Sequence, residues 1–435
     1  MANIIPFRGL RYNPDKVGNL MSVVTPPYDV VDETAQAKYY AENPSNVIRL
    51  ELGMVLPQDS INNNRYTRAA QYLEKWIEDD ILRYEDKPAL YIYQQEFLVE
   101  GHKNVRTGFI CGLKVEEYTK GNIFPHEQTF SKPKADRLQL IRSTRSNFSS
   151  VFGLYSDQKM LINNILSEQM KLHQPDAELI DEFGETHKIW VITNNNIINQ
   201  VVKFMAGKKI YIADGHHRYE AALEYAQEMS EQGCLGFDYV MITLFNLYDQ
   251  GLVILPTHRM VANIPYLDFN TFKKHLGELF ELEEISADTD FATLGPELAL
   301  RGQKNHVLGM YTSEMKAYIL TVKSHDQVAA LLPADKSPAW KNLDVVILDN
   351  VILGQILGIG ENDRYSQKNL AYSNSARVLI DQIKKQNCQL GFIVNPTPVQ
   401  QLVEVAEAHD KMPQKSTYFY PKLATGLVIN HLGIE

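Results

Sequence analysis

The stretch that decides the fold reads Lys209-Ile210-Tyr211-Ile212-Ala213-Asp214-Gly215-His216-His217-Arg218-Tyr219-Glu220-Ala221-Ala222-Leu223. An apolar, strand-like run at 209–212 leads into an acid, a glycine, two histidines and an arginine in five consecutive positions. After these, apolar side chains recur at helical spacing: Ala222, Leu223, Ala226 and Met229. This order predicts a strand, a tight turn and the N-terminus of a helix.

Such a turn has the chemistry of an anion site. The first backbone N–H groups of a helix attract anions, and Gly215 would let the backbone approach a phosphate closely. Arg218 offers a planar fork that suits phosphate or carboxylate, whereas Asp214 could cap the helix or hold a cation. Two adjacent histidines and an arginine are poor choices for a simple cap, so the pattern favours a binding site over a polar first turn.

Composition sets the frame for this site. The chain has 435 residues, 44% of them hydrophobic, which allows two or three domains with sizeable cores. A net charge of −10 argues against a general nucleic-acid binder. No apolar run is long enough to cross a membrane, the N-terminus lacks a signal-peptide pattern, and the three cysteines show no CxxC spacing. We therefore expect a cytoplasmic chain without a membrane partner, a disulfide framework or a thiolate zinc site.

Strand and helix patterns are mixed along the chain rather than strictly alternating, which predicts an α+β fold with mixed sheets. We expect three parts: an N-terminal segment at 1–88 that packs on the core, a central domain at 89–264 with a polar insertion, and an additional α+β domain at 265–435. We expect an antiparallel hairpin of Ala89–Leu98 with Arg106–Val115, followed by a polar segment at Phe124–Asp157. Further strands are expected at Asp238–Leu247 and Leu252–Met260, and helices at Arg65–Ile81 and Leu343–Leu357.

A second polar cluster begins at Pro125-His126-Glu127-Gln128-Thr129 and continues through Lys132, Lys134 and Asp136-Arg137 to Asn147-Phe148-Ser149-Ser150. His126-Glu127 is similar to the start of a zincin helix, but Phe130 stands where the second histidine would be needed, so a zincin metalloprotease is excluded. What remains is a carboxylate beside an imidazole, followed by cations that could neutralise phosphates. A solvated polar loop is the equally good alternative.

A third cluster, Met412-Pro413-Gln414-Lys415-Ser416-Thr417-Tyr418-Phe419-Tyr420-Pro421-Lys422, combines two lysines with two hydroxyls. Lys415, Ser416, Thr417 and Lys422 could form a phosphate cradle, or the aromatic residues could pack in a core beside a charged edge. The familiar phosphate-binding signatures are absent, since the sequence has no GxxxxGK[ST] loop and no GxGxxG after a strand. A nucleotide would therefore bind on a less common scaffold.

Together with Pro26-Pro27-Tyr28-Asp29, these three clusters resemble the bacterial domain of unknown function 1015 family. The Asp214–Arg218 segment is more distantly similar to the ParB/sulfiredoxin-like superfamily, whose members place such a turn against nucleotide phosphates. The resemblance implies a ParB/sulfiredoxin-like central core, and the Asp-Gly-His-His-Arg form looks most like the branch of kinases that phosphorylate free serine. Glu127 is the residue that matches that branch's catalytic glutamate by type.

These observations predict a small-molecule phosphotransferase that uses a nucleoside triphosphate or diphosphate with Mg²⁺. Its expected catalytic residues are Glu127 as the base, Asp214, which also holds the metal, and His217. The phosphates would be bound by the turn and by the third cluster, and further pocket residues would come from the second: Gly215, His216, Arg218, Lys415, Ser416, Thr417 and Lys422, with His126, Thr129 and Arg137. The alternatives are a nucleotide-binding regulatory module without turnover and a hydrolase that uses His126 and Glu127 with a bound metal.

Overall fold

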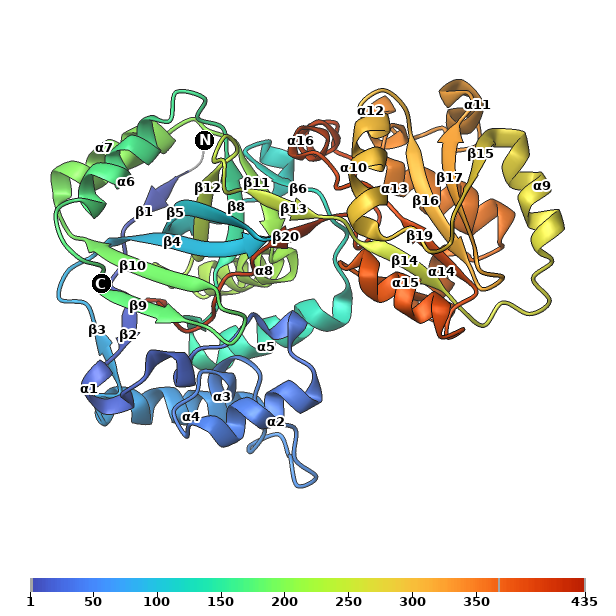
Figure 1. The fold of residues 1–435 in the computed structure, drawn as a ribbon. Coiled ribbons are helices and arrows are strands. Elements are labelled where there is room, and N and C mark those ends of the chain that lie inside the picture. Colours follow the sequence, from blue (N-terminus) through green and yellow to red (C-terminus); the bar gives the residue numbers. More distant parts are fainter. Residues whose placement is uncertain (1–2, 367, 434–435) are drawn as a thin grey trace. The chain divides into compact units, whose positions relative to one another are not determined.

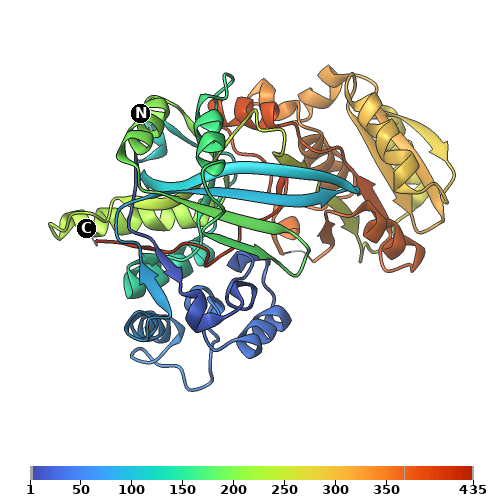
Figure 2. The ribbon, with the colours of Figure 1, turned by 60° about the vertical axis from the view of Figure 1, so that its left-hand side comes forward.

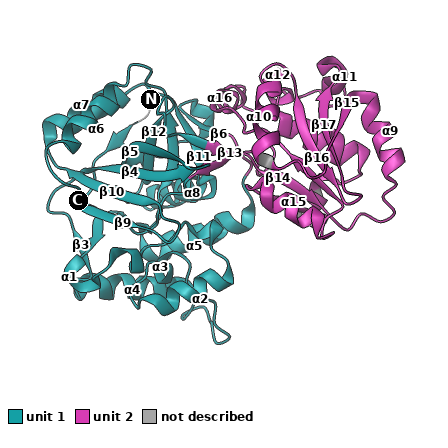
Figure 3. Cartoon of the chain, in the orientation of Figure 1, with its two compact units in different colours: residues 1–125, 129–253, 421–435 teal, residues 126–128, 254–420 magenta. Residues whose placement is uncertain are grey.

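The computed structural model describes residues 3–366 and 368–433 and confirms an α+β chain with mixed sheets. Contacts divide it into two compact units, shown in Figure 3. Unit 1 contains the chain up to Pro125, Thr129–Val253 and the chain from Pro421 onward, and unit 2 contains His126–Gln128 and Ile254–Tyr420. Residues on both sides of position 88 lie in unit 1. The division into three parts stays a prediction.

The predicted antiparallel hairpin lies at the centre of unit 1. β4 (Leu90–Val99) pairs with β5 (His102–Lys114), and both strands are largely buried. They belong to a nine-stranded sheet of described residues with the order β6-β11-β8-β12-β5-β4-β10-β9, in which β1 also pairs with β5. Figures 1 and 2 show α6 and α7 on one side of this sheet and α5 and α8 on the other. The strands are β1 (Ile4–Ile5), β6 (Ile123–Pro125), β8 (Val151–Tyr155), β9 (Ala177–Ile180), β10 (Thr186–Ile192), β11 (Ile210–Asp214) and β12 (Tyr239–Asn246).

Helices cover the unit 1 sheet because each carries an apolar face. α8 turns Tyr219, Ala222 and Tyr225 into the same core cluster as the central strands. The N-terminal segment forms a separate small core around Leu73 and Trp76 of α4. The remaining elements of unit 1 are β2 (Leu10–Tyr12), α1 (Pro14–Val17), η1 (Leu20–Val23), η2 (Tyr28–Val30), α2 (Glu33–Glu42), α3 (Ile48–Glu51), α4 (Arg65–Glu78), β3 (Leu82–Tyr84), η3 (Tyr118–Lys120), α5 (Ser131–Thr144), β7 (Ser146–Asn147), α6 (Leu161–Met170), α7 (Asn195–Met205), α8 (His216–Glu231) and β21 (Asn430–His431).

The described residues of unit 2 form a six-stranded sheet with the order β15-β17-β16-β19-β14-β18. The hairpin of β16 with β17 pairs Gly309 with Ile319, and α10 and α15 pack beside it. Its elements, with β13 at the boundary, are β13 (Val253–Leu255), β14 (His258–Val261), α9 (Phe269–Leu279), β15 (Phe280–Ile285), α10 (Phe291–Gly302), β16 (Val307–Thr312), β17 (Lys316–Val322), α11 (His325–Ala330), α12 (Pro338–Lys341), α13 (Asp344–Val346), η4 (Ile347–Ile356), α14 (Glu361–Ser366), β18 (Leu370–Ser373), α15 (Ala376–Lys384), β19 (Leu390–Ile393), α16 (Val399–Glu407) and β20 (Tyr418–Tyr420).

Three sequence expectations were wrong in detail. The polar segment Phe124–Asp157 contains the helix α5, because its charged residues face partners while Leu138 and Ile141 enter the core. The strand expected at Leu252–Met260 is interrupted around Pro256, which has no N–H to donate to a ladder. The helix expected at Leu343–Leu357 is π-helical from Ile347 onward. Among the described residues, no helix combines the length and apolar character needed to cross a membrane.

Candidate functional site

The predicted strand, turn and helix are present in unit 1. β11 ends at Asp214, Gly215 has a φ of 87°, and α8 begins at His216. Gly215 is the N-cap, and because it has no side chain the N-cap residue leaves the first turn of α8 uncapped. The capping role suggested for Asp214 is therefore wrong, because this residue is the last of the strand. A glycine N-cap after a strand is an arrangement that favours anions at the first turn of a helix.

Arg218 lies against this uncapped turn. Its side chain is 8% exposed, its NH1 donates to the Ser150 carbonyl at 2.6 Å, and its NH2 lies 3.6 Å from Asp214 Oδ2. A Cβ on Gly215 would lie 2.8 Å from Nε of Arg218, so the guanidinium covers the glycine directly. That Nε is buried and has no hydrogen-bond partner among the described residues. A buried, incompletely satisfied guanidinium is costly unless a ligand completes it.

Asp214 lies between two cations. Lys422 Nζ is 3.1 Å from Oδ2 of Asp214, and Arg218 approaches the same oxygen. Burial raises the pKa of Asp214, but the charges of Lys422 and Arg218 outweigh this and hold the pKa well below its usual range. The carboxylate is thus ionised at any working pH. It is suited to balancing charge or binding a cation and poorly suited to accepting a proton.

His217 contacts the segment that follows β6. Its Nε2 accepts a hydrogen bond from the Phe130 N–H at 2.9 Å, and the neighbouring Glu220 accepts one from Thr129 Oγ1 at 2.6 Å. Burial lowers the pKa of His217, so the ring is neutral at pH 7. Because Nε2 accepts, the ring proton is on Nδ1, where it can be donated to an anion.

A second buried arginine, Arg137, lies near Arg218. It donates to Glu51 Oε1 at 3.0 Å, and its guanidinium lies 3.9 Å from the centre of the Tyr28 ring. Glu51 also accepts from Ser149 Oγ at 2.7 Å. Both arginines line a cavity of about 30 Å³, room for about one or two waters. Sequence reasoning missed Glu51, whereas Ser149 belonged to the second cluster and Tyr28 had a signal in the Pro26-Pro27-Tyr28-Asp29 motif.

His126–Gln128 of the second cluster and residues 412–420 of the third belong to unit 2. His126 is buried, its Nε2 lies 3.1 Å from Thr417 Oγ1, and Glu127 is bridged to Met412. Ser416 is buried and donates to the Pro413 carbonyl at 2.5 Å, while Lys415 is exposed. Unit 1 thus brings together Asp214, Arg218 and Lys422, and also holds Thr129 and Arg137. Unit 2 brings together His126 and Thr417, and a single cleft for all three clusters stays a prediction.

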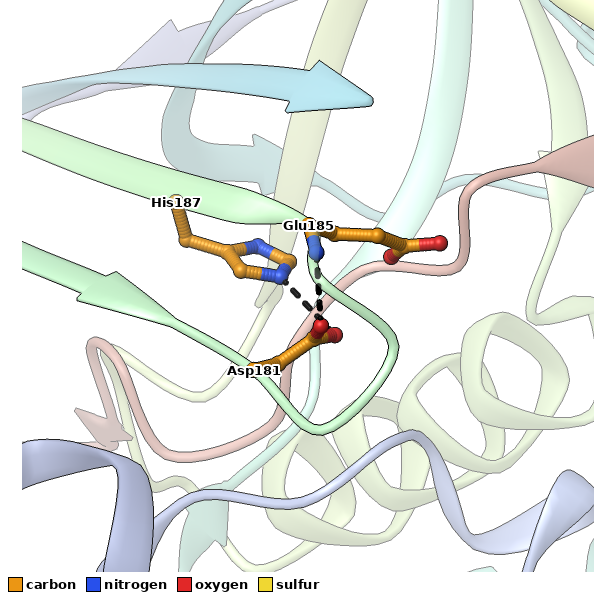
Figure 4. Close-up of side chains that lie close together, drawn as sticks. All are labelled: Asp181, Glu185 and His187. Carbon is orange, nitrogen blue, oxygen red and sulfur yellow. Dashed lines mark hydrogen bonds and ion pairs between the residues drawn. The ribbon is translucent and has the colours of Figure 1, made fainter. Parts of the chain in front are cut away.

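One further group has the composition of a metal site. Ligand atoms of Asp181, Glu185 and His187 lie within 4.8 Å of one another. In Figure 4 the carboxylate of Glu185 points away from the imidazole of His187. The backbone N–H of Glu185 donates to Asp181. Tyr93 Oη accepts the Ala424 N–H at 3.2 Å and donates to His187 Nδ1 at 2.7 Å, so His187 Nε2 carries the proton and faces Asp181 at 3.3 Å. These donors fit a hydrogen-bond chain better than a metal, which needs the Nε2 lone pair.

Comparisons with known proteins place the chain as follows. Similar solved structures include a free serine kinase in complex with AMP (10% identity, TM-score 0.33, covering 69% of this chain and 84% of that one). They also include a conserved hypothetical protein from Pyrococcus furiosus (11%, 0.32, 70% and 89%) and SbnI with a C-terminal truncation from Staphylococcus aureus (9%, 0.36, 74% and 87%). A comparison with curated proteins gave no match.

The family model described as "Protein of unknown function (DUF1015)" matches residues 4–346. This range contains the Tyr28 motif, the His126–Arg137 segment and the Asp214 turn, whereas Met412–Lys422 lies beyond it. The similarity to the ParB/sulfiredoxin-like superfamily stays a prediction. Because the match covers well over half of its length, the chain belongs to the DUF1015 family of proteins of unknown function.

Proposed function

We propose that the chain is a phosphotransferase that binds nucleotide phosphates at the β11–α8 turn and transfers a phosphoryl group to the hydroxyl of a small molecule. The observation that carries the proposal is the uncapped first turn of α8, with a left-handed glycine beneath the buried, incompletely satisfied guanidinium of Arg218. Backbone N–H groups and a guanidinium fork are complementary to phosphate oxygens. Lys422 adds a second cation at the same point.

The reaction asks little covalent chemistry of the protein. The acceptor oxygen attacks the terminal phosphorus, the bond from phosphorus to the bridging oxygen breaks, and the hydroxyl proton passes to a base. Charge on the phosphoryl oxygens would be stabilised by Arg218, Lys422 and the turn N–H groups. Asp214 is a weak base because two cations hold its pKa down. We therefore keep Glu127 as the proposed base and assign Asp214 to ordering Arg218 and Lys422.

Mg²⁺ would fit this site through the carboxylate of the turn. The ion binds through one or two carboxylates, waters and substrate phosphates rather than through a protein cage. Asp214 is the residue of the turn that would hold it, sharing its negative charge with Lys422 and Arg218. When bound, Mg²⁺ neutralises phosphate charge.

A regulatory module that binds a nucleotide without turnover is the second candidate. The observation that favours it is the same ion pair, because a carboxylate locked between two cations can serve binding alone. The two candidates differ in one measurable outcome, the appearance of a phosphorylated product.

The test compares binding and turnover in Asp214→Asn and Glu127→Gln. Both retain side-chain size, and we expect nucleotide affinity within roughly tenfold of wild type, since neither acid attracts an anion in the ground state. We expect Asp214→Asn to lose transfer from a nucleotide with Mg²⁺ to a hydroxyl acceptor. Free serine is the first acceptor to try, because of the resemblance of the motif. Asp238→Asn is the control, as Asp238 forms an exposed pair with Lys114 in the same unit. Tight nucleotide binding by wild type without product from any acceptor would favour the regulatory module.

A further inference from the structure

The position of Lys422 raises a physical question. Its Nζ pairs with Asp214, yet it belongs to the C-terminal segment that rejoins unit 1 at Pro421, and 207 residues separate it from the turn (422 − 214 − 1). Ordering a lysine side chain costs up to about 2 kcal/mol, and in this largely buried ion pair the desolvation of both charges offsets much of their attraction. The pair with Asp214 therefore cannot by itself hold the segment in place. Something else must fix its backbone.

The β4–β5 hairpin supplies that fixation. Arg106 NH2 donates to the Pro421 carbonyl at 2.8 Å, Gln95 Nε2 donates to the Lys422 carbonyl at 3.0 Å, and the Ala424 N–H donates to Tyr93 Oη at 3.2 Å. These side chains are at most 1% exposed. Figures 1 and 2 show the segment, in dark red, running along the sheet beside β4 and β10. The backbone on both sides of Lys422 is thus bonded to buried groups.

Arg106 is itself held from several sides. Its guanidinium lies over the rings of Phe152 and Phe245, with ring centres 4.8 and 4.6 Å away, and its NH2 donates to Gln95 Oε1 at 2.5 Å. Burial lowers its pKa to about 10, so it is still charged at pH 7. A buried guanidinium packed on two aromatic rings has little freedom to move. Arg106 therefore fixes both Gln95 and the Pro421 carbonyl in one geometry.

Tyr93 is oriented by the group drawn in Figure 4. Its hydroxyl donates to His187 Nδ1, and His187 faces Asp181, which accepts the backbone N–H groups of the β9–β10 turn. This chain of hydrogen bonds explains why Asp181, Glu185 and His187, which have the composition of a metal site, lie close together. Its far end is the N–H of Ala424, two residues from Lys422.

We propose that Arg106, Gln95 and Tyr93 are positioning residues whose role is to place Lys422 at the Asp214 turn. This inference rests on the proposed function only where Lys422 is taken to face a bound phosphate. The placement of Lys422 itself is a property of the folded chain and can be measured without any ligand.

The experiment measures the acylation rate of Lys422 in the folded full-length chain by mass spectrometry, with exposed Lys159 of unit 1 as the internal reference. Gln95→Glu keeps the size of the side chain and places a carboxylate oxygen against the Lys422 carbonyl. Tyr93→Phe removes only the hydroxyl. We expect each to raise the Lys422 rate about fivefold over Lys159, the factor that corresponds to one hydrogen bond of about 1 kcal/mol. Arg106→Gln should raise it further.

Tyr155→Phe is the matched control. Tyr155 is a buried tyrosine of the same sheet whose hydroxyl faces Asn163, so its loss should leave the Lys422 rate unchanged. If Arg106→Gln does not fold, Gln95→Glu and Tyr93→Phe decide the question. Unchanged Lys422 rates in folded variants would overturn the inference.

Inorganic phosphate and nucleotide binding, measured by calorimetry on the same variants, separates this inference from the proposed function. A raised Lys422 rate with weaker binding supports both. A raised rate with unchanged binding supports the positioning role and removes Lys422 from the phosphate site. Weaker binding with an unchanged rate overturns the positioning role and leaves the phosphate site to the turn.

Discussion

Each unit buries an arginine against an aspartate, and the two pairs differ in how completely the arginine is satisfied. In unit 2, Arg259 is 0% exposed and binds Asp349 through two parallel bonds, Nε to Oδ1 at 3.0 Å and NH2 to Oδ2 at 3.1 Å. Its NH1 donates to the Thr257 and Lys415 carbonyls. In unit 1, Arg218 approaches Asp214 only to 3.6 Å and keeps a buried Nε that has no hydrogen-bond partner in the described part of the chain.

The difference separates a structural arginine from one available to a ligand. Arg259 has its charge and its donors used within the protein, so an anion would have to break existing bonds. Arg218 has donor capacity left, beside the uncapped end of a helix and a small cavity. Burial and charge alone would not distinguish Arg218 from Arg259 as a residue available to a ligand. The count of satisfied donors distinguishes them.

The largest expected effect is in unit 2. Asp349→Asn leaves the Arg259 charge buried without its partner, and we expect a loss of about 3–5 kcal/mol of stability in that unit. Hydrogen exchange followed by mass spectrometry measures this for unit 2 separately from unit 1. Glu283→Gln is the control, since Glu283 forms an exposed pair with Arg301 in the same unit and should cost at most about 1 kcal/mol. Equal losses from the two would show that the bidentate geometry is not what stabilises unit 2.

The next effect is on binding at the Asp214 turn. Arg218→Ala should weaken nucleotide affinity about 10- to 100-fold, the range of a hydrogen bond to a charged group. Arg218→Lys should rescue little, because an ammonium lacks the planar fork. Arg142→Ala, which breaks an exposed pair with Glu228, should bind like wild type in the same calorimetric titration. If Arg218→Ala bound nucleotide as tightly as wild type, Arg218 would be a structural arginine like Arg259.

How far the sequence predicts this site follows from the range of the interactions. The strand, turn and helix at 209–223 were predicted because their signals are local: an apolar run, a glycine and a helical stripe. The sequence grouped Lys422 with the Asp214 turn as phosphate ligands, but the ion pair between them has no local signal, since it depends on where a distant segment returns. Glu51 lacked any signal because a lone glutamate next to a leucine has no periodicity or motif.

The helix α5 shows that a local pattern also fails to predict which charged side chains have partners. Its charges suggested a solvated segment, and only the fold shows that Asp136 pairs with Arg65, Lys134 with Glu224 and Arg137 with Glu51. Charged residues with distant partners have the same local pattern as charged residues in water. Element positions were therefore more predictable than the roles of polar side chains.

The stability of unit 2 as a function of pH tests the buried environment of Arg259. His258 precedes Arg259 and is 1% exposed; burial lowers its pKa to about 4, and the Arg259 charge adds to this. The folded chain then binds fewer protons than the unfolded chain, so stability is full above about pH 6.5 and falls toward pH 4. We expect His258 to account for about 2 kcal/mol of stability lost by unit 2 between pH 7 and 4.5. His258→Gln should remove that part, as followed by hydrogen exchange at both pH values, and an unaltered pH dependence in the variant would refute it.

The smallest expected effect isolates the placement of Arg218 from backbone strain. Gly215→Ala puts a side chain at a φ of 87°, which costs about 1 kcal/mol, and its Cβ would lie 2.8 Å from Arg218 Nε, so the guanidinium must move. Gly121→Ala is the matched control in the same unit, because Gly121 has a φ of 71° and no described atom lies within 4 Å of the new Cβ. Both variants bear the same kind of backbone strain, but only Gly215→Ala should bind nucleotide more weakly, by about fivefold for about 1 kcal/mol of lost contact. Since the strain is shared, the difference in affinity between the two variants measures what the position of the guanidinium contributes, and equal affinities would mean that Arg218 can leave the turn without consequence.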